Sequence, residues 1–399
     1  MKAKVIRRVA GAVGLLLVVA VAYLCFWPVP AQPVSWQASV PPGYTGAHAV
    51  NTRLSGLRRI DIGTEFGPEH MAIGRDGKLY AAMTSGNLLR MDADGGNREV
   101  FANTGGRVLG FDFDAGGRMI AADAMRGLLA IDAVGKVSLL TDRVSASDPI
   151  VYANSIVVAP DGTVYFTDSS TRFSPVKWGS TLEASVLDII EQSASGRVLA
   201  YDPATSKTRI VARGLSFANG IALSSDGKSL FVNETGRYRI WKIDGRANDV
   251  TVGRGSPQAR VLLDNLPGYP DNLMRGRNGR IWVGLFRPRN PAADRLPSGR
   301  SCEKSCCGCR VPSCRPANCT GMSLRWTRKA ALPKTCRIPK APIPRPPERP
   351  KPPIASTSTA CMRPQSVGCR DKTPFMDGPA VVSAASTPAE DRFAIDPPI

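Results

Sequence analysis

The chain has 399 residues, and 52 Lys and Arg against 33 Asp and Glu give it a formal net charge of +19. Most of that charge lies in the first eight residues and in the segment from residue 291 onward, which disfavours a uniformly basic protein that coats nucleic acid. Nine of the ten cysteines lie between Cys302 and Cys369, which disfavours a disulfide-stapled small domain. The two histidines, His48 and His70, leave little room for a histidine-rich metal site.

The N-terminus has the pattern of a membrane anchor. Residues 9–27 are uncharged and mostly apolar, and four basic residues precede them. At about 1.5 Å per residue this run just spans a hydrocarbon core of about 30 Å. We therefore expect a cytoplasmic flank over 1–8, a transmembrane anchor over 9–27, and the rest of the chain on the extracytoplasmic side. A cleaved signal peptide is the alternative. The prolines that follow predict an extended linker over 28–50.

The body of the chain, residues 51–296, repeats one short pattern. A turn ending in glycine precedes a short apolar strand, and a second strand often follows, which is typical of β-hairpins. The turn glycines are Gly77, Gly117, Gly162, Gly227 and Gly279. Their spacing of 40 to 65 residues fits propeller blades with insertions, whereas a β-sandwich explains strands without this recurrence. One short helix is expected over 182–191, inside an insertion.

Several of these stretches resemble a known family. They include GPEHMAIGRDGKLYAA (67–82), ANSIVVAPDGTVYFTDSSTRF (153–173), GLSFANGIALSSDGKSLFVNETGRYRIWKI (214–243) and NLPGYPDNLMRGRNGRIWVGL (265–285). The chain resembles the strictosidine synthase-like branch of the six-bladed propellers, which includes the adipocyte plasma membrane-associated proteins and, more distantly, paraoxonases and gluconolactonases. The resemblance implies an all-β, six-bladed β-propeller after an N-terminal transmembrane helix.

Four polar residues stand at equivalent places in the repeat, each seven residues before the first residue of a turn. They are Glu69, Asn154, Asn219 and Asp271. In such propellers the innermost strands begin near a central tunnel, so the constant offset predicts that these side chains converge there. Carboxylate and amide oxygens are ligands that Ca²⁺ prefers, and the resemblance implies the same calcium site, with Asn272 assisting. The alternative is that Asn and Asp only cap the turns.

A central calcium ion implies hydrolysis of a lactone, an aryl ester or a phosphoester. Asp271 is the candidate catalytic residue, as a ligand that also acts as base or nucleophile, and His70 is a candidate to support Glu69. The sequence around Ser169 and Ser170 is expected to shape a rim loop. Two alternatives stay open: an amine–aldehyde condensation of the strictosidine synthase type, and a non-catalytic binding scaffold. We expect a small-molecule substrate, membrane attachment and no nucleic-acid partner.

The tail over 297–399 departs from the family. It is rich in Cys, Pro and Arg, and the strand pattern ends. The spacing of Cys306 and Cys309 permits a zinc module, and the composition permits a disordered basic tail. The abrupt change favours a shifted reading frame. On that hypothesis the last blade is missing or disrupted, the tail is irregular, and the open propeller folds poorly or binds calcium weakly.

Overall fold

The computed structural model describes residues 2–26, 30–276, 279–295, 381–387 and 390–392. The chain divides into two compact units, which are described separately. In the first unit the described residues form helix α1 (Lys2–Phe26). The predicted helical segment at the N-terminus is thus confirmed as a helix. Its predicted membrane-spanning role is not supported, because no helix among the described residues meets the length and apolarity that a membrane span requires.

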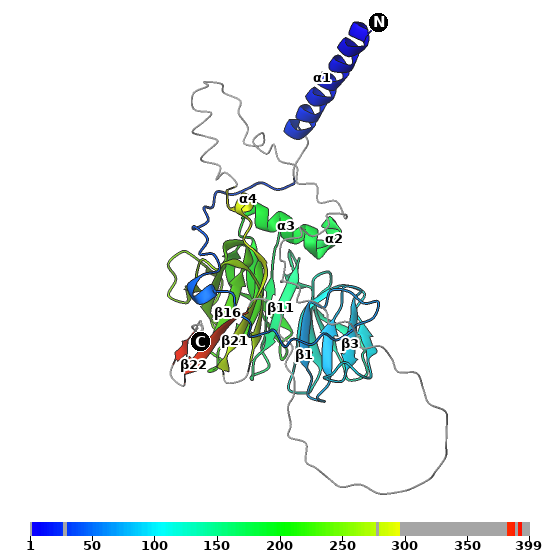
Figure 1. The fold of residues 1–399 in the computed structure, drawn as a ribbon. Helices are drawn as coiled ribbons and strands as arrows, with labels where there is room; N and C mark the ends of the chain where they lie inside the picture. Colours follow the sequence, from blue (N-terminus) through cyan, green and yellow to red (C-terminus); the bar gives the residue numbers. More distant parts are fainter. Residues whose placement is uncertain (1, 27–29, 277–278, 296–380, 388–389, 393–399) are drawn as a thin grey trace, which may run out of the picture. The chain divides into compact units, whose positions relative to one another are not determined.

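The second unit consists mainly of antiparallel sheets that follow one another along the chain (Figure 1). The first sheet contains β1 (His70–Ile73), β2 (Leu79–Ala82), β3 (Asn87–Met91) and β4 (Glu99–Asn103). The second contains β5 (Val108–Phe113), β6 (Met119–Asp123), β7 (Gly127–Ile131) and β8 (Val137–Thr141). A two-stranded ribbon of β9 (Arg143–Ser145) and β10 (Asp148–Pro149) follows.

The third sheet contains β11 (Ala153–Val158), β12 (Val164–Asp168), β13 (Gly196–Asp202), β14 (Lys207–Leu215) and, paired in parallel with β14, β18 (Val250–Thr251). The fourth contains β15 (Ala218–Leu223), β16 (Ser229–Glu234), β17 (Arg239–Asp244) and β19 (Ala259–Leu263). Glycine turns join the first two strands of each sheet, as predicted. Gly77 and Gly162, for example, adopt φ values of 76° and 88°, which side chains rarely permit.

The last described sheet contains β20 (Gly268–Arg275), β21 (Ile281–Pro288), β22 (Val381–Thr387) and β23 (Glu390–Arg392). Ile281 to Gly284 of β21 pair with Val381 to Ala384 of β22. Ten residues of the tail therefore supply two strands, where the sequence predicts irregular chain. The nine tail cysteines lie outside the described residues. The expected six blades are not confirmed, since the described residues form five sheets of four or five strands.

The first strands of the sheets lie against one another in chain order, from β1 to β5, β11, β15 and β20. The side-chain amide of Asn272 in β20 also donates to the backbone carbonyl of Glu69, which directly precedes β1, at 3.0 Å. The five first strands therefore surround a common centre, which is the arrangement of a propeller. Apolar side chains fill the space between sheets; Val198, Val232 and Ile243 are fully buried between the third and fourth.

Helices lie at one end of these sheets (Figure 1). They are α2 (Pro175–Trp178), α3 (Thr181–Glu191) and α4 (Pro291–Asp294), and the 3₁₀ turns are η1 (Gly46–His48) and η2 (Thr235–Arg237). Helix α3 confirms the helix predicted over 182–191. It begins after Ser180, whose hydroxyl accepts a hydrogen bond from the Glu183 backbone N–H at 3.2 Å, an ordinary N-cap.

The predicted linker over 28–50 is docked where the structure describes it. The Val34 backbone N–H donates to the Glu191 carbonyl at the end of α3, at 2.7 Å. The Arg289 guanidinium donates to the Ser39 carbonyl, also at 2.7 Å. The segment therefore packs along α3 and the last sheet, because its backbone groups find partners there.

Candidate functional site

The first strands carry β-bulges at the positions that the sequence singles out. In β11 the register shifts between Ala153 and Ile156, so that Asn154 lies in the bulge. Asn219 lies in the equivalent bulge of β15, and Asp271 in that of β20. A bulge turns a side chain away from the regular pleat. The constant offset of seven residues therefore marks a repeated bulge that re-aims a side chain in three sheets.

A direct hydrogen bond and a charge interaction link three of the four predicted residues, Glu69, Asn219 and Asp271. The Asn219 side-chain amide donates to Oδ1 of Asp271 at 2.7 Å, across two neighbouring sheets. The charges of Glu69 and Asp271 act on each other strongly enough to shift the Glu69 pKa. Asn154 lies on β11, between β5 and β15, and its amide donates to the Ser169 hydroxyl at 2.9 Å.

The three side-chain amides at the centre make the same kind of hydrogen bond to protein. Asn154, Asn219 and Asn272 each use the side-chain NH₂ for a hydrogen bond to protein. Their carbonyl oxygens are buried and have no hydrogen-bond partner among the described residues. Buried acceptors are nearly always satisfied, so three such oxygens on the neighbouring first strands β11, β15 and β20 call for a bound donor or cation.

The surroundings of the two carboxylates, Glu69 and Asp271, disfavour their ionised forms. Burial raises the pKa of Glu69 to about 7, with the Asp271 charge as the second cause and Arg107 acting in the opposite direction. Burial also raises the pKa of Asp271, although the hydrogen bond from Asn219 lowers it. Two acids that disfavour each other's ionisation are the usual sign of a missing positive charge or of an acid–base pair.

The second sheet departs from the pattern. Leu109 occupies the bulge of β5 and stands seven residues before Gly116, so it is the counterpart of the four polar residues. It is 3% exposed and packs with Tyr152 and Phe217 beneath α3. One side of the centre is therefore apolar. Leu109 was not predicted, although the same offset of seven residues marks it.

Sequence reasoning also missed Arg107, which lies two residues before Leu109. Its Nη2 donates to Glu69 Oε2 at 3.2 Å and to the Gly67 carbonyl at 3.0 Å. The repeat marks its position in the sequence, because Arg107 stands two residues before Leu109 just as Tyr152 stands two residues before Asn154. The charge of Glu69, together with that of Asp271, raises the Tyr152 pKa further above the effect of its burial, which places Tyr152 near both acids.

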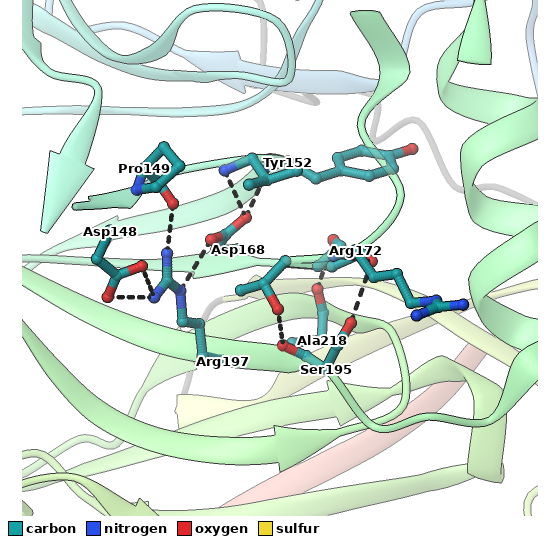
Figure 2. Close-up of polar contacts among 12 residues, drawn as sticks. Asp148, Pro149, Tyr152, Asp168, Arg172, Ser195, Arg197 and Ala218 are labelled. Carbon is teal, nitrogen blue, oxygen red and sulfur yellow. Dashed lines mark hydrogen bonds and ion pairs between the residues drawn. The ribbon is translucent and has the colours of Figure 1, made fainter. Parts of the chain in front are cut away.

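A buried acid at the end of the second strand fixes the start of the first strand in three sheets. Asp168 Oδ1 accepts from the Tyr152 backbone N–H at 2.7 Å, and Asp123 and Glu234 accept in the same way from Arg107 and Ser216. Figure 2 shows Arg197 between Asp168 and Asp148, with bonds of 2.9 Å and 2.7 Å. These carboxylates hold the bulged strands in position.

Two further residues with predicted roles, His70 and Ser169, are both buried. His70 packs edge-on against Phe111, with ring centroids 4.8 Å apart, and burial lowers its pKa to about 4, so that it is neutral at pH 7. Ser169, expected in a rim loop, is instead fully buried and donates to the Ala218 carbonyl at 2.6 Å while it holds the Asn154 amide.

The possible metal ligands at the centre suit a hard cation only if the amide oxygens are among them. Among the described residues no three His, Cys, Asp or Glu side chains gather into a metal-binding group. Two carboxylates and up to three amide oxygens do lie at the centre, and such neutral and anionic oxygens are the ligands of Ca²⁺. The residues present therefore fit a calcium ion and do not fit a zinc site.

The chain matches the family described as "SMP-30/Gluconolactonase/LRE-like region" over residues 61–319. It is 34% identical over 258 residues to protein STRICTOSIDINE SYNTHASE-LIKE 6 of Arabidopsis thaliana, covering 63% of this chain and 64% of the relative. It is 30% identical over 285 residues to the adipocyte plasma membrane-associated protein of Danio rerio, covering 67% and 65%. The matches thus span somewhat less than two thirds of these relatives' length.

Among solved structures, a gluconolactonase from Xanthomonas campestris aligns with a TM-score of 0.45 at 22% identity, over 64% of this chain and 82% of its own. The curated relatives confirm the resemblance to the strictosidine synthase-like branch. Because the family match covers more than half of the sequence, the chain belongs to the SMP-30/gluconolactonase/LRE-like family.

Proposed function

We propose that the protein is a calcium-dependent hydrolase of lactones or aryl esters, with the ion held by Glu69, Asn154, Asn219 and Asp271. The observation that carries the proposal is the set of buried amide oxygens on three neighbouring first strands that have no partner among the described residues, together with two carboxylates of raised pKa. A divalent cation would satisfy the oxygens and offset the repulsion between the acids.

Calcium takes six to eight oxygen ligands, so the four residues, Asn272 and water molecules suffice for one ion. When bound, such an ion polarises a carbonyl oxygen and lowers the pKa of water. The family membership agrees with a lactonase-type activity, and the relatives' names do not decide the substrate.

Asp271 is the residue that we assign to proton transfer. Its Oδ1 is fixed by the Asn219 amide at 2.7 Å, which leaves Oδ2 to take a proton from water. In the metal-free protein, burial raises the pKa of Asp271 above that of an exposed aspartate. In the reaction the water oxygen bonds to the acyl carbon while Asp271 takes the water proton, the bond from the acyl carbon to the departing oxygen breaks, and Asp271 returns the proton to that oxygen.

The test is hydrolysis of phenyl acetate and of a γ-lactone by the full chain, with calcium and after its removal by EGTA. Asp271→Asn should abolish calcium-dependent turnover. Asp112→Asn is the matched control, because Asp112 is also a partly buried acid of a first strand with a raised pKa. Turnover that survives EGTA or Asp271→Asn would overturn the proposal. An assay of amine–aldehyde condensation checks the alternative activity, and no activity on any substrate would favour the scaffold.

Membrane attachment and an extracytoplasmic location stay predictions of the sequence, supported by the four basic residues before the uncharged run over 9–27. Fractionation of cells that express the full chain, followed by carbonate extraction, tests them. Recovery in the carbonate-soluble fraction would contradict the attachment.

A further inference from the structure

Glu191 is a buried acid at a position that is unfavourable for its own helix. It is the last residue of α3, and only 1% of it is exposed. The last turn of α3 contains no basic residue, and the helix dipole disfavours a negative charge at a C-terminus. A buried carboxylate is also costly unless it is paired and hydrogen-bonded. The partners of Glu191 outside α3 therefore stabilise it.

One set of these partners belongs to residues 31–40, which we call the strap. The Gln32 backbone N–H donates to Glu191 Oε2 at 2.8 Å, and the Val34 backbone N–H donates to the Glu191 carbonyl at 2.7 Å. Further along the strap, Trp36 packs against Tyr238, with ring centroids 6.0 Å apart. The docked strap therefore supplies hydrogen bonds both to the side chain and to the backbone at the end of α3.

The other carboxylate oxygen of Glu191 bonds to a different part of the chain. Its Oε1 pairs with Arg172 Nε at 2.6 Å. Arg172 belongs to the loop that follows β12 (Figure 2). Within this loop the Ser170 hydroxyl accepts a hydrogen bond from the Arg172 backbone N–H at 3.2 Å and lies 3.1 Å from the Ser195 hydroxyl. Glu191 thus connects the strap to the loop after β12.

The start of the same loop holds a predicted calcium ligand. Ser169 directly follows β12 and is fully buried. Its hydroxyl accepts a hydrogen bond from the Asn154 side-chain amide at 2.9 Å and donates to the Ala218 carbonyl at 2.6 Å. Because the NH₂ and the carbonyl oxygen of Asn154 belong to one planar amide, the bond to the NH₂ also orients the oxygen. A shift of the loop would therefore move the Asn154 oxygen.

We propose that Glu191 is a positioning residue through which the docked strap fixes the Asn154 side chain and so raises the affinity of the centre for calcium. This inference rests on the proposed function. Outer groups that orient a metal ligand commonly change metal affinity when they are substituted. The calcium affinity of the site then depends on whether the strap lies on α3.

Charge alone predicts a different pattern of effects. Glu191→Gln removes a negative charge, which by itself weakens the binding of a cation, whereas Arg172→Met removes a positive charge, which by itself strengthens it. Positioning predicts weaker calcium binding in both variants. Gln32→Pro changes no charge and removes the N–H that donates to Glu191. The signs of the three effects therefore separate positioning from electrostatics.

The experiment measures calcium affinity by calorimetry in the full chain, for wild type and these three variants, with thermal melting of the calcium-free proteins as the check of folding. We expect each variant to bind calcium at least about threefold more weakly. Adding Gln32→Pro to Glu191→Gln should weaken binding little further, because both break the same connection. A loss of stability alone would lower the melting temperature and leave the affinity of the folded protein unchanged.

Two control substitutions match these variants. Glu183→Gln removes the charge of an exposed acid on the same helix. Gln37→Pro changes an exposed residue of the strap whose backbone N–H has no hydrogen-bond partner among the described residues. Both substitutions should leave the calcium affinity unchanged.

The outcomes separate the two proposals. If wild type does not bind calcium, the proposed function fails and this inference falls with it. If wild type binds calcium but Gln32→Pro or Arg172→Met binds it no more weakly, only the inference is overturned. Equal weakening by Gln32→Pro and Gln37→Pro would overturn it as well. If Glu191→Gln or Arg172→Met does not fold, Gln32→Pro decides, because Gln32 is exposed.

Discussion

Asn219 and Asp271 belong to different sheets, yet the side-chain amide of Asn219 lies 2.7 Å from Oδ1 of Asp271. The contact orients both side chains, because it fixes one carboxylate oxygen and leaves the Asn219 carbonyl oxygen buried with no partner in the part of the chain that the structure describes. The same sheets approach closely behind it, where the Asn233 amide donates to the Asp271 backbone carbonyl at 2.8 Å. The site thus depends on the packing of neighbouring first strands.

Gly220 follows Asn219 and makes this approach possible. A Cβ there would lie 2.4 Å from the Leu273 backbone nitrogen and 2.5 Å from the Asp271 carbonyl oxygen, and backbone atoms cannot easily move aside. Gly220→Ala should therefore cost about 1–3 kcal/mol in the free energy of unfolding and weaken calcium binding by displacing Asp271. Denaturant unfolding and calorimetry measure the two effects. Gly56→Ala is the control, since nothing lies within 4 Å of its added Cβ; equal effects at both positions would refute the explanation.

Calcium affinity should depend on pH through Glu69. Its pKa is raised to about 7 in the metal-free protein, and a calcium ion binds the ionised form. Protons therefore compete below pH 7, and affinity should fall about tenfold for each pH unit below that value and level off above it. Glu69→Gln should flatten this dependence. A wild-type affinity that is constant between pH 5.5 and 7 would contradict the assignment.

Arg197 should matter for stability more than for chemistry. It is the ionic partner of the fully buried Asp168, which holds the strand that leads to Asn154 (Figure 2). Arg197→Met leaves a buried charge unpaired, which should cost about 3–5 kcal/mol and lower the melting temperature by about 10 °C. Arg143→Met removes an exposed ion pair with Asp142 and should cost less than about 1 kcal/mol. A loss at Arg197 no larger than at Arg143 would show that the network does not support the sheet.

The sequence of the gene tests the shifted frame. The change of composition begins near residue 297, and the residues that follow, up to 380, lie outside the described part of the structure. We expect independent reads across codons 295–302 to differ by an insertion or deletion that restores the family's strand pattern. An intact frame in every read would exclude the hypothesis.

Sequence reasoning could predict the strands and single out the four polar residues because both follow a local repeat. The glycine turns need positive φ, and the bulges repeat at a fixed distance from them, so both leave a periodic trace. Leu109 and Arg107 were missed because the search was for oxygen ligands, although the same period marks Leu109. The docked linker at Val34 and the pairing of β21 with β22 depend on contacts between residues far apart in sequence, which leave no local pattern.

The central claim is that one calcium ion binds at the common centre of the first strands. A crystal structure of the full chain grown with calcium tests it most directly. The account predicts an ion within about 2.3–2.6 Å of the Asn154 and Asn219 side-chain carbonyl oxygens and the Glu69 and Asp271 carboxylates. Crystals grown at saturating calcium with no ion among these four residues would contradict it.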